Sequence, residues 1–134
     1  MEKGHHADQR RGPGRSDFRS AREALTSDLE AAVIVTTTLG DETAALGLAR
    51  AVVEERLAAC VHLTPITSVY RWQGKVEEAR EWSCQMKTTP DRTARLLERV
   101  RAFHPYQVPE ILVLPVAGGD PSYLRWLAQS VRDS

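Results

Sequence analysis

With 134 residues, the chain is long enough for one domain with a single hydrophobic core and too short for two. Its 18 Lys and Arg residues balance 18 Asp and Glu residues, so no global charge attracts nucleic acid or acidic substrates. The sequence contains neither an apolar run long enough to span a bilayer nor the apolar core of a signal peptide, which predicts a cytoplasmic protein without a membrane partner.

Residues 1–30 are predicted to be a disordered or weakly helical N-terminal extension. The first fifteen residues carry charge, glycine and proline without apolar periodicity, a composition that cannot offset the entropy of ordering. From Ser16 to about Glu30, apolar residues at helical spacing allow a short helix with Ser16 as its N-cap. The folded domain is therefore expected over residues 31–134.

The first strand and first helix of this domain are expected over residues 31–38 and 42–57. The segment 31–38 is a continuous apolar and β-branched run, typical of a strand that is buried on both faces. Gly40 and Asp41 then supply a turn and an N-cap, and apolar residues recur at spacings of three and four as far as Leu57.

A long β-hairpin is predicted next, with strands over residues 58–72 and 75–88. Gln73 and Gly74 form the turn, because glycine tolerates the positive φ that two-residue hairpin turns require. Pro65 cannot donate to the ladder, which indicates an edge position or a bulge. Near the tip, Tyr70 and Trp72 lack an evident core, so the hairpin is expected to project and to need another surface over its aromatic side chains.

Cys60 and Cys84, the two cysteines, are interpreted as reduced thiols. A turn centred on Gln73 and Gly74 places Cys60 opposite Lys87 and Cys84 opposite Leu63, too far apart for a disulfide. Cys60 and His62 share a strand face, a spacing that could hold one metal ion, although a buried cysteine beside an edge histidine is the commoner arrangement.

A second helix is predicted from Thr89 to His104, with the Thr89 hydroxyl as its N-cap and Pro90 in its first turn. Pro105 ends this helix and Pro109 follows, so the segment His104–Glu110 cannot be helical. The segment holds an imidazole, a phenol, an amide and a carboxylate, which makes it either a functional site or a plain connection from helix to strand. A third apolar strand is expected over residues 110–116, followed by a last helix that Asp120 caps and Pro121 begins.

The order strand, helix, strand, strand, helix, strand predicts an α+β fold. It is the ferredoxin-like βαββαβ sandwich, with an extra C-terminal helix and a long hairpin between its second and third strands. This fold supports many functions. RNA binding is disfavoured because Val33, Val35, Ile111 and Val113 replace exposed aromatics, and the loop after the first strand has neither the Cys pair of a metallochaperone nor the arginine of an acylphosphatase.

Several segments together resemble the CutA family, known as divalent-cation tolerance proteins. The resemblance covers roughly residues 31–132 in order and without a large gap, and the segments that carry it are Leu57–Val61, Ile66–Lys75, Met86–Thr88, His104–Glu110, Leu114–Val116 and Tyr123–Leu127.

The resemblance implies a homotrimer similar to PII signalling proteins, with hairpins packed around the threefold axis and clefts between subunits. It also implies a link to copper and other divalent metals. Some members bind copper through a cysteine at the end of the first strand and two histidines before the Pro-Tyr pair. Those three positions are Thr37, Phe103 and His104 here, so only His104 is retained.

Two functions follow as hypotheses. The first is a trimeric, metal-binding protein of copper tolerance or response, with His104 as the leading ligand and Cys60 with His62 as further candidates. The alternative is a PII-like regulatory module whose intersubunit cleft binds a small anion or metabolite through Lys87, Tyr106 and Glu110. No spacing supports an activated nucleophile, so the sequence does not predict an enzyme.

Overall fold

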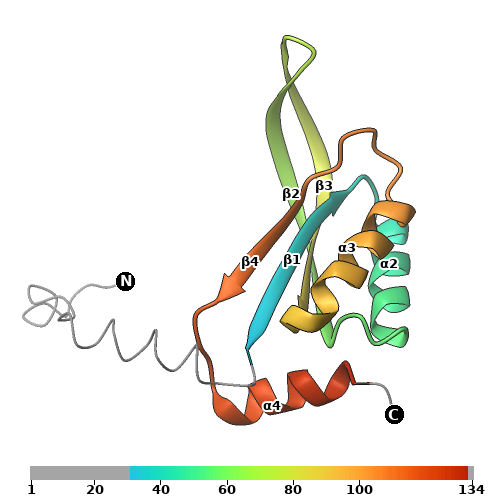
Figure 1. The fold of residues 1–134 in the computed structure, drawn as a ribbon. Coiled ribbons are helices and arrows are strands. Elements are labelled where there is room, and N and C mark those ends of the chain that lie inside the picture. The colour runs from blue at the N-terminus through green and yellow to red at the C-terminus, as the bar shows by residue number, and fades with distance from the viewer. Residues whose placement is uncertain (1–30, 133–134) are drawn as a thin grey trace, which may run out of the picture.

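The computed structural model describes residues 31–132 as a four-stranded antiparallel sheet with three helices (Figure 1). The sheet order is β2-β3-β1-β4, which confirms the ferredoxin-like α+β architecture. The helix expected between Ser16 and Glu30 lies outside the described residues. The elements in chain order are β1 (Ala32–Leu39), α2 (Glu42–Glu54), β2 (Cys60–Trp72), β3 (Lys75–Thr88), α3 (Pro90–Phe103), β4 (Ile111–Val116) and α4 (Pro121–Ser130).

Helices α2 and α3 cover one face of the sheet and enclose the main core. Alternate residues of a strand point to opposite faces, so Val33 and Val35 of β1 face these helices together with Cys84 and Met86 of β3. The helices contribute their apolar faces to the same cluster, through Ala45, Leu48, Val52, Leu96 and Val100.

Helix α4 packs against one end of the other face. Ala32 and Val116 are paired in the sheet, and both lie in a second apolar cluster with Leu124 and Leu127 of α4. Because Ala32 precedes Val33 in the strand, this cluster lies on the side opposite α2 and α3. Figure 1 shows α4 at the end of the sheet away from the hairpin.

The rest of that second face, called the open face below, is covered by no helix formed by residues 31–132. Ile34 and Thr36 of β1 lie there beside Leu114 and Leu112 of the edge strand β4. Leu112 is 55% exposed and Leu114 is 45% exposed, although the sequence of β4 is as apolar as that of a buried strand. The open face therefore exposes apolar side chains that a strand of this composition would normally bury.

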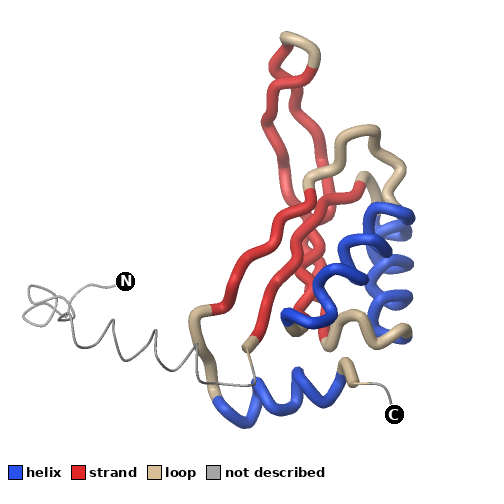
Figure 2. Tube along the Cα trace, in the orientation of Figure 1, coloured by secondary structure: helices blue, strands red, loops and turns tan. Residues whose placement is uncertain are grey.

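The hairpin of β2 and β3 pairs without interruption from Cys60 opposite Lys87 to Trp72 opposite Lys75. Pro65 therefore lies in an unbulged edge strand, which confirms the first of its two expected explanations. Gln73 and Gly74 form the turn with φ values of 51° and 81°. The outer half of the hairpin projects beyond the rest of the sheet, and the loop from α3 to β4 lies at the same end (Figure 2).

Three local expectations need correction. Helix α2 ends at Glu54 rather than near residue 57, because Arg56 adopts a φ of 60° and turns the chain toward β2. Strand β2 begins at Cys60 rather than at residue 58. The Thr89 hydroxyl does not cap α3, since it donates to the Asp91 carboxylate at 2.6 Å instead of accepting from a backbone N–H.

The other two caps form as the sequence predicts. Asp41 accepts a hydrogen bond from the Ala44 N–H, and Asp120 accepts one from the Tyr123 N–H. Within residues 31–132, no helix has the length and apolar character needed to cross a membrane.

The turn gives a direct test of the hairpin geometry. We expect Gly74→Ala to lower the free energy of unfolding by about 1 kcal/mol, because a side chain is strained in the left-handed region. A Cβ at Gly74 would have no atom within 4 Å, so the cost comes from the backbone alone.

Gly118→Ala is the matched control, since a Cβ there also meets nothing within 4 Å and its φ is outside the left-handed region. Urea unfolding at one fixed protein concentration measures both variants. Equal stabilities for the two would contradict the turn geometry.

Candidate functional site

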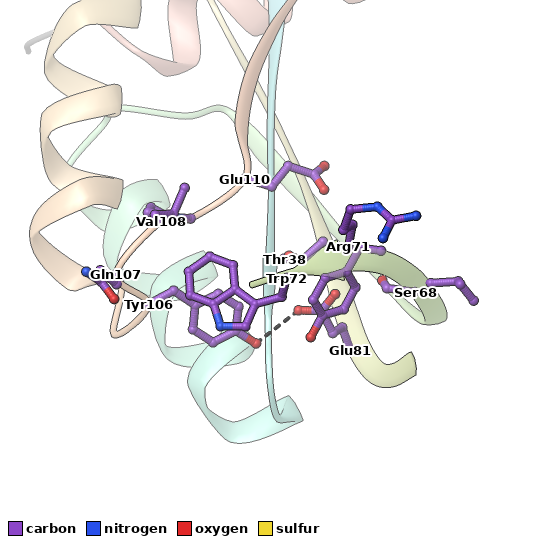
Figure 3. A pocket seen from close by; sticks show the side chains of 12 residues that line it. Thr38, Ser68, Arg71, Trp72, Glu81, Tyr106, Gln107, Val108 and Glu110 are labelled. Atoms are coloured by element: carbon purple, nitrogen blue, oxygen red, sulfur yellow. Dashed lines mark hydrogen bonds between the residues drawn. The ribbon is translucent and has the colours of Figure 1, made fainter. Parts of the chain in front are cut away.

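A cleft lies where the projecting hairpin faces the loop between α3 and β4. Its volume is about 880 Å³. Three strands and the loop line it, through Thr38 of β1, Tyr70, Arg71 and Trp72 of β2, Glu81 of β3, and Tyr106 and Glu110 of the loop among others (Figure 3). The segment His104–Glu110, which the sequence singled out, therefore forms one wall of a cleft.

His104 fastens the beginning of this loop to β1. Its Nε2 lies 2.7 Å from the Thr38 carbonyl oxygen, and its Nδ1 lies 3.2 Å from the Tyr106 backbone nitrogen. A carbonyl oxygen can only accept and a backbone N–H can only donate, so the proton of the neutral ring is on Nε2. Both ring nitrogens are thus used to hold the loop.

Thr37 fastens the other end of the loop. Its side chain is fully buried, and its hydroxyl donates to the Glu110 carbonyl oxygen at 2.7 Å. This bond satisfies two polar groups that would otherwise be unpaired beside the core. The residue at the family's cysteine position therefore has a clear structural role in this chain.

Tyr106 joins the loop to the hairpin. Its hydroxyl donates to Glu81 Oε2 at 2.9 Å, and its ring meets the His104 ring edge-on with centroids 4.6 Å apart. Burial raises the pKa of Tyr106 to about 12, with further contributions from the Glu81 carboxylate, Tyr70 and Asp41. The phenol is consequently a hydrogen-bond donor at neutral pH.

Lys87 is separated from Tyr106 and Glu110, with which the sequence grouped it. Its ammonium donates to the Tyr123 hydroxyl at 3.3 Å and lies 5.4 Å from the centre of that ring. These contacts place Lys87 beside α4 on the open face, where its neighbours in the sheet are Cys60 and Ile34. Within one chain, the cleft brings together Tyr106 and Glu110 without Lys87.

The three candidate metal ligands also divide into two places. Cys60 and His62 lie opposite Lys87 and Gln85 on the open face, whereas His104 lies at the end of α3. Among residues 31–132, no three His, Cys, Asp or Glu side chains are grouped so that they could hold a metal ion. Since both nitrogens of His104 are engaged, a metal ion would have to replace one of its hydrogen bonds.

Sequence reasoning missed the partners of Tyr106 in the cleft. It placed Tyr70 and Trp72 at the hairpin tip and expected another surface to cover them, and it assigned no role to Glu81. The hairpin register does show that Glu81 and Tyr70 lie on the same strand face. No sequence signal indicates that the distant Tyr106 reaches that face.

The fold and the cleft together define a class: a small ferredoxin-like domain with an extended hairpin and a ligand-sized cleft between that hairpin and the loop from α3 to β4. The family described as CutA1 divalent ion tolerance protein matches residues 33–130, and the chain belongs to that family.

Individual relatives agree with this assignment. A protein of Thermus thermophilus named divalent-cation tolerance protein CutA is 50% identical over 98 residues, which cover 72% of this chain and 95% of that protein. A protein of the same name from Escherichia coli O139:H28 is 48% identical over 103 residues, covering 76% and 92%. The structure of CutA from Synechococcus elongatus superposes with a TM-score of 0.75 at 38% identity, covering 78% of this chain and 94% of that one.

The surroundings of Tyr106 predict its ionisation. Because its pKa is raised to about 12 from an ordinary 10.0, its protonated form stabilises the fold fully below pH 10, and that stabilisation is lost as the pH rises through 12. Absorbance at 295 nm during an alkaline titration should show one late phenol that is missing in Tyr106→Phe.

Glu81→Gln should shift this late ionisation toward lower pH without abolishing the shift, because burial is its largest cause. Unchanged titration curves in both variants would contradict the contact between Tyr106 and Glu81.

Proposed function

We propose that this chain serves divalent-cation tolerance as a homotrimer. The observation that carries the proposal is the family match over residues 33–130, which includes nearly every described strand and helix. The relatives from Thermus thermophilus and Escherichia coli are named for divalent-cation tolerance, and the chain spans more than nine tenths of each.

The open face supports the homotrimeric part of the proposal. Leu112 and Leu114 lie exposed in the single chain next to Ile34, and the rings of Tyr123 and Trp126 lie on α4 beside the same face. An apolar surface of this kind is stabilised when other copies cover it. Covering it would also remove the unpaired edge of β4 from solvent.

For metal binding itself, we place the ligands on Cys60 and His62 rather than on His104. A thiolate and an imidazole suit copper and zinc, and both side chains lie on the face through which copies are proposed to meet. A single chain supplies two of the donors that such an ion needs, so the remaining donors come from other copies. His104 already uses both nitrogens to hold the cleft loop.

The second candidate function is a PII-like regulatory module that binds a small molecule in the cleft. The cleft volume of about 880 Å³ favours it, because sites for small ligands are usually a few hundred cubic ångströms or more.

Two expectations from the sequence remain predictions: that the chain is not an enzyme, and that it works in the cytoplasm.

The homotrimer predicts that a charge on the open face will prevent assembly. Light scattering at micromolar concentration should give about three times the 15.0 kDa chain mass for the unmodified chain. Leu112→Glu should give a lower mass, because burying an unpaired carboxylate is costly.

Val53→Glu is the control, since Val53 is 41% exposed but lies on α2 behind the sheet, and it should leave the mass unchanged. A monomeric unmodified chain, or a trimeric Leu112→Glu variant, would reject assembly through the open face.

The metal ligands can be separated by calorimetric titration of the purified chain with copper and with zinc. We expect the variant Cys60→Ser with His62→Ala to lose binding at least tenfold, and His104→Gln to retain it. Glutamine can still donate a hydrogen bond to the Thr38 carbonyl, so this change tests ligation more than folding.

The opposite pattern, with binding lost only in His104→Gln, would make His104 the ligand that the sequence first suggested. Absence of binding to the unmodified chain would remove direct metal binding by these residues from the proposal.

A further inference from the structure

The cleft combines aromatic rings with carboxylates in a way that selects one class of ligand. Tyr70 and Trp72 from β2 and Tyr106 from the loop line it, and they are 45%, 40% and 39% exposed. Tyr70 and Tyr106 thus line the same cleft, one from the hairpin and the other from the loop. An aromatic face carries partial negative charge and attracts cations.

Two carboxylates line the same cleft. The Tyr106 hydroxyl holds Glu81 in place, and Glu110 lies at the end of the loop next to β4 (Figure 3). Within residues 31–132, neither carboxylate forms an ion pair with another side chain. Both charges are therefore available to a ligand that enters the cleft.

Arg71 is the cation among the residues that line the cleft, and its charge is directed elsewhere. Its Nη1 donates to the Gly74 carbonyl oxygen at 3.4 Å, in the turn at the hairpin tip. Figure 3 shows the guanidinium turned away from the Tyr106 and Glu81 pair. With two carboxylates against one guanidinium, the cleft repels a small anion more than it attracts one.

A bare metal ion suits this cleft poorly as well. No three His, Cys, Asp or Glu side chains of the described residues are grouped as metal ligands there. An alkylated ammonium group is weakly hydrated, fits against aromatic faces and still benefits from nearby carboxylates.

We propose that the cleft binds an organic cation, with its ammonium group between Trp72, Tyr70 and Tyr106 and facing Glu81. The proposal rests on the second candidate function and names its ligand class. The volume of about 880 Å³ exceeds what one ammonium group fills, so the ligand would carry a further substituent extending toward Glu110.

Choline and dimethylbutanol are suitable probes, because dimethylbutanol has nearly the same shape as choline but carries no charge. Calorimetric titration of the full chain in its solution assembly should show choline binding at least about tenfold more tightly than dimethylbutanol. Succinate is a third probe, which tests the opposite charge.

Trp72→Leu and Glu81→Gln should each weaken choline binding several-fold. Val53→Ala is the control, because Val53 is 41% exposed on α2, away from both the cleft and the open face, and it should leave binding unchanged. Light scattering on each variant would show that assembly is retained.

The outcomes test the class of ligand separately from small-molecule binding in the cleft, the function on which the proposal rests. Succinate binding that depends on Arg71, without choline binding, would overturn the organic cation and keep a cleft that binds small molecules. Equal binding of choline and dimethylbutanol would show that charge is not recognised and would also overturn the proposal. If none of the three probes binds, both the organic cation and the small-molecule function of the cleft are rejected. The homotrimer is tested separately by light scattering.

Discussion

The structure depends on the uninterrupted pairing of β2 with β3. All thirteen residues of β2 pair with β3, from Cys60 at the base to Trp72 at the turn. A slip of β2 by one position would exchange its two faces and turn Tyr70 and Trp72 away from Glu81 and from the loop that carries Tyr106. The register is therefore what creates the cleft, and the two left-handed residues of the turn maintain it.

The opposite wall of the cleft is fixed by a few polar contacts rather than by packing. His104 joins the loop to the Thr38 carbonyl, Thr37 joins it to β1 again at Glu110, and Tyr106 joins it to Glu81. These contacts give a short, proline-containing loop a defined position, and they explain why a histidine is useful here without a metal ion. A residue at a family ligand position can thus have a structural role in a particular chain.

The two faces of the sheet show how one fold can serve both stability and assembly. The face under α2 and α3 contains the fully buried residues of the core, including Val35, Leu48 and Leu96. The second face has α4 over one end, and the open face that makes up the rest of it carries the exposed leucines of β4. A chain that belongs to the CutA1 family therefore presents exposed apolar side chains and its cleft lining on the same sheet, with Cys60 and His62 on the open face.

The sequence by itself determined the order of the elements, the hairpin register and two of the three helix caps, because these depend on periodicity, turn residues and neighbours in the chain. It also placed His104, Tyr106 and Glu110 on one rigid segment. Only the tertiary structure decided that Tyr106 meets Glu81, that Lys87 lies with Tyr123 instead, and that His104 has no free nitrogen. Each of these contacts joins segments that are far apart in the chain, and local sequence patterns do not encode how such segments meet in space.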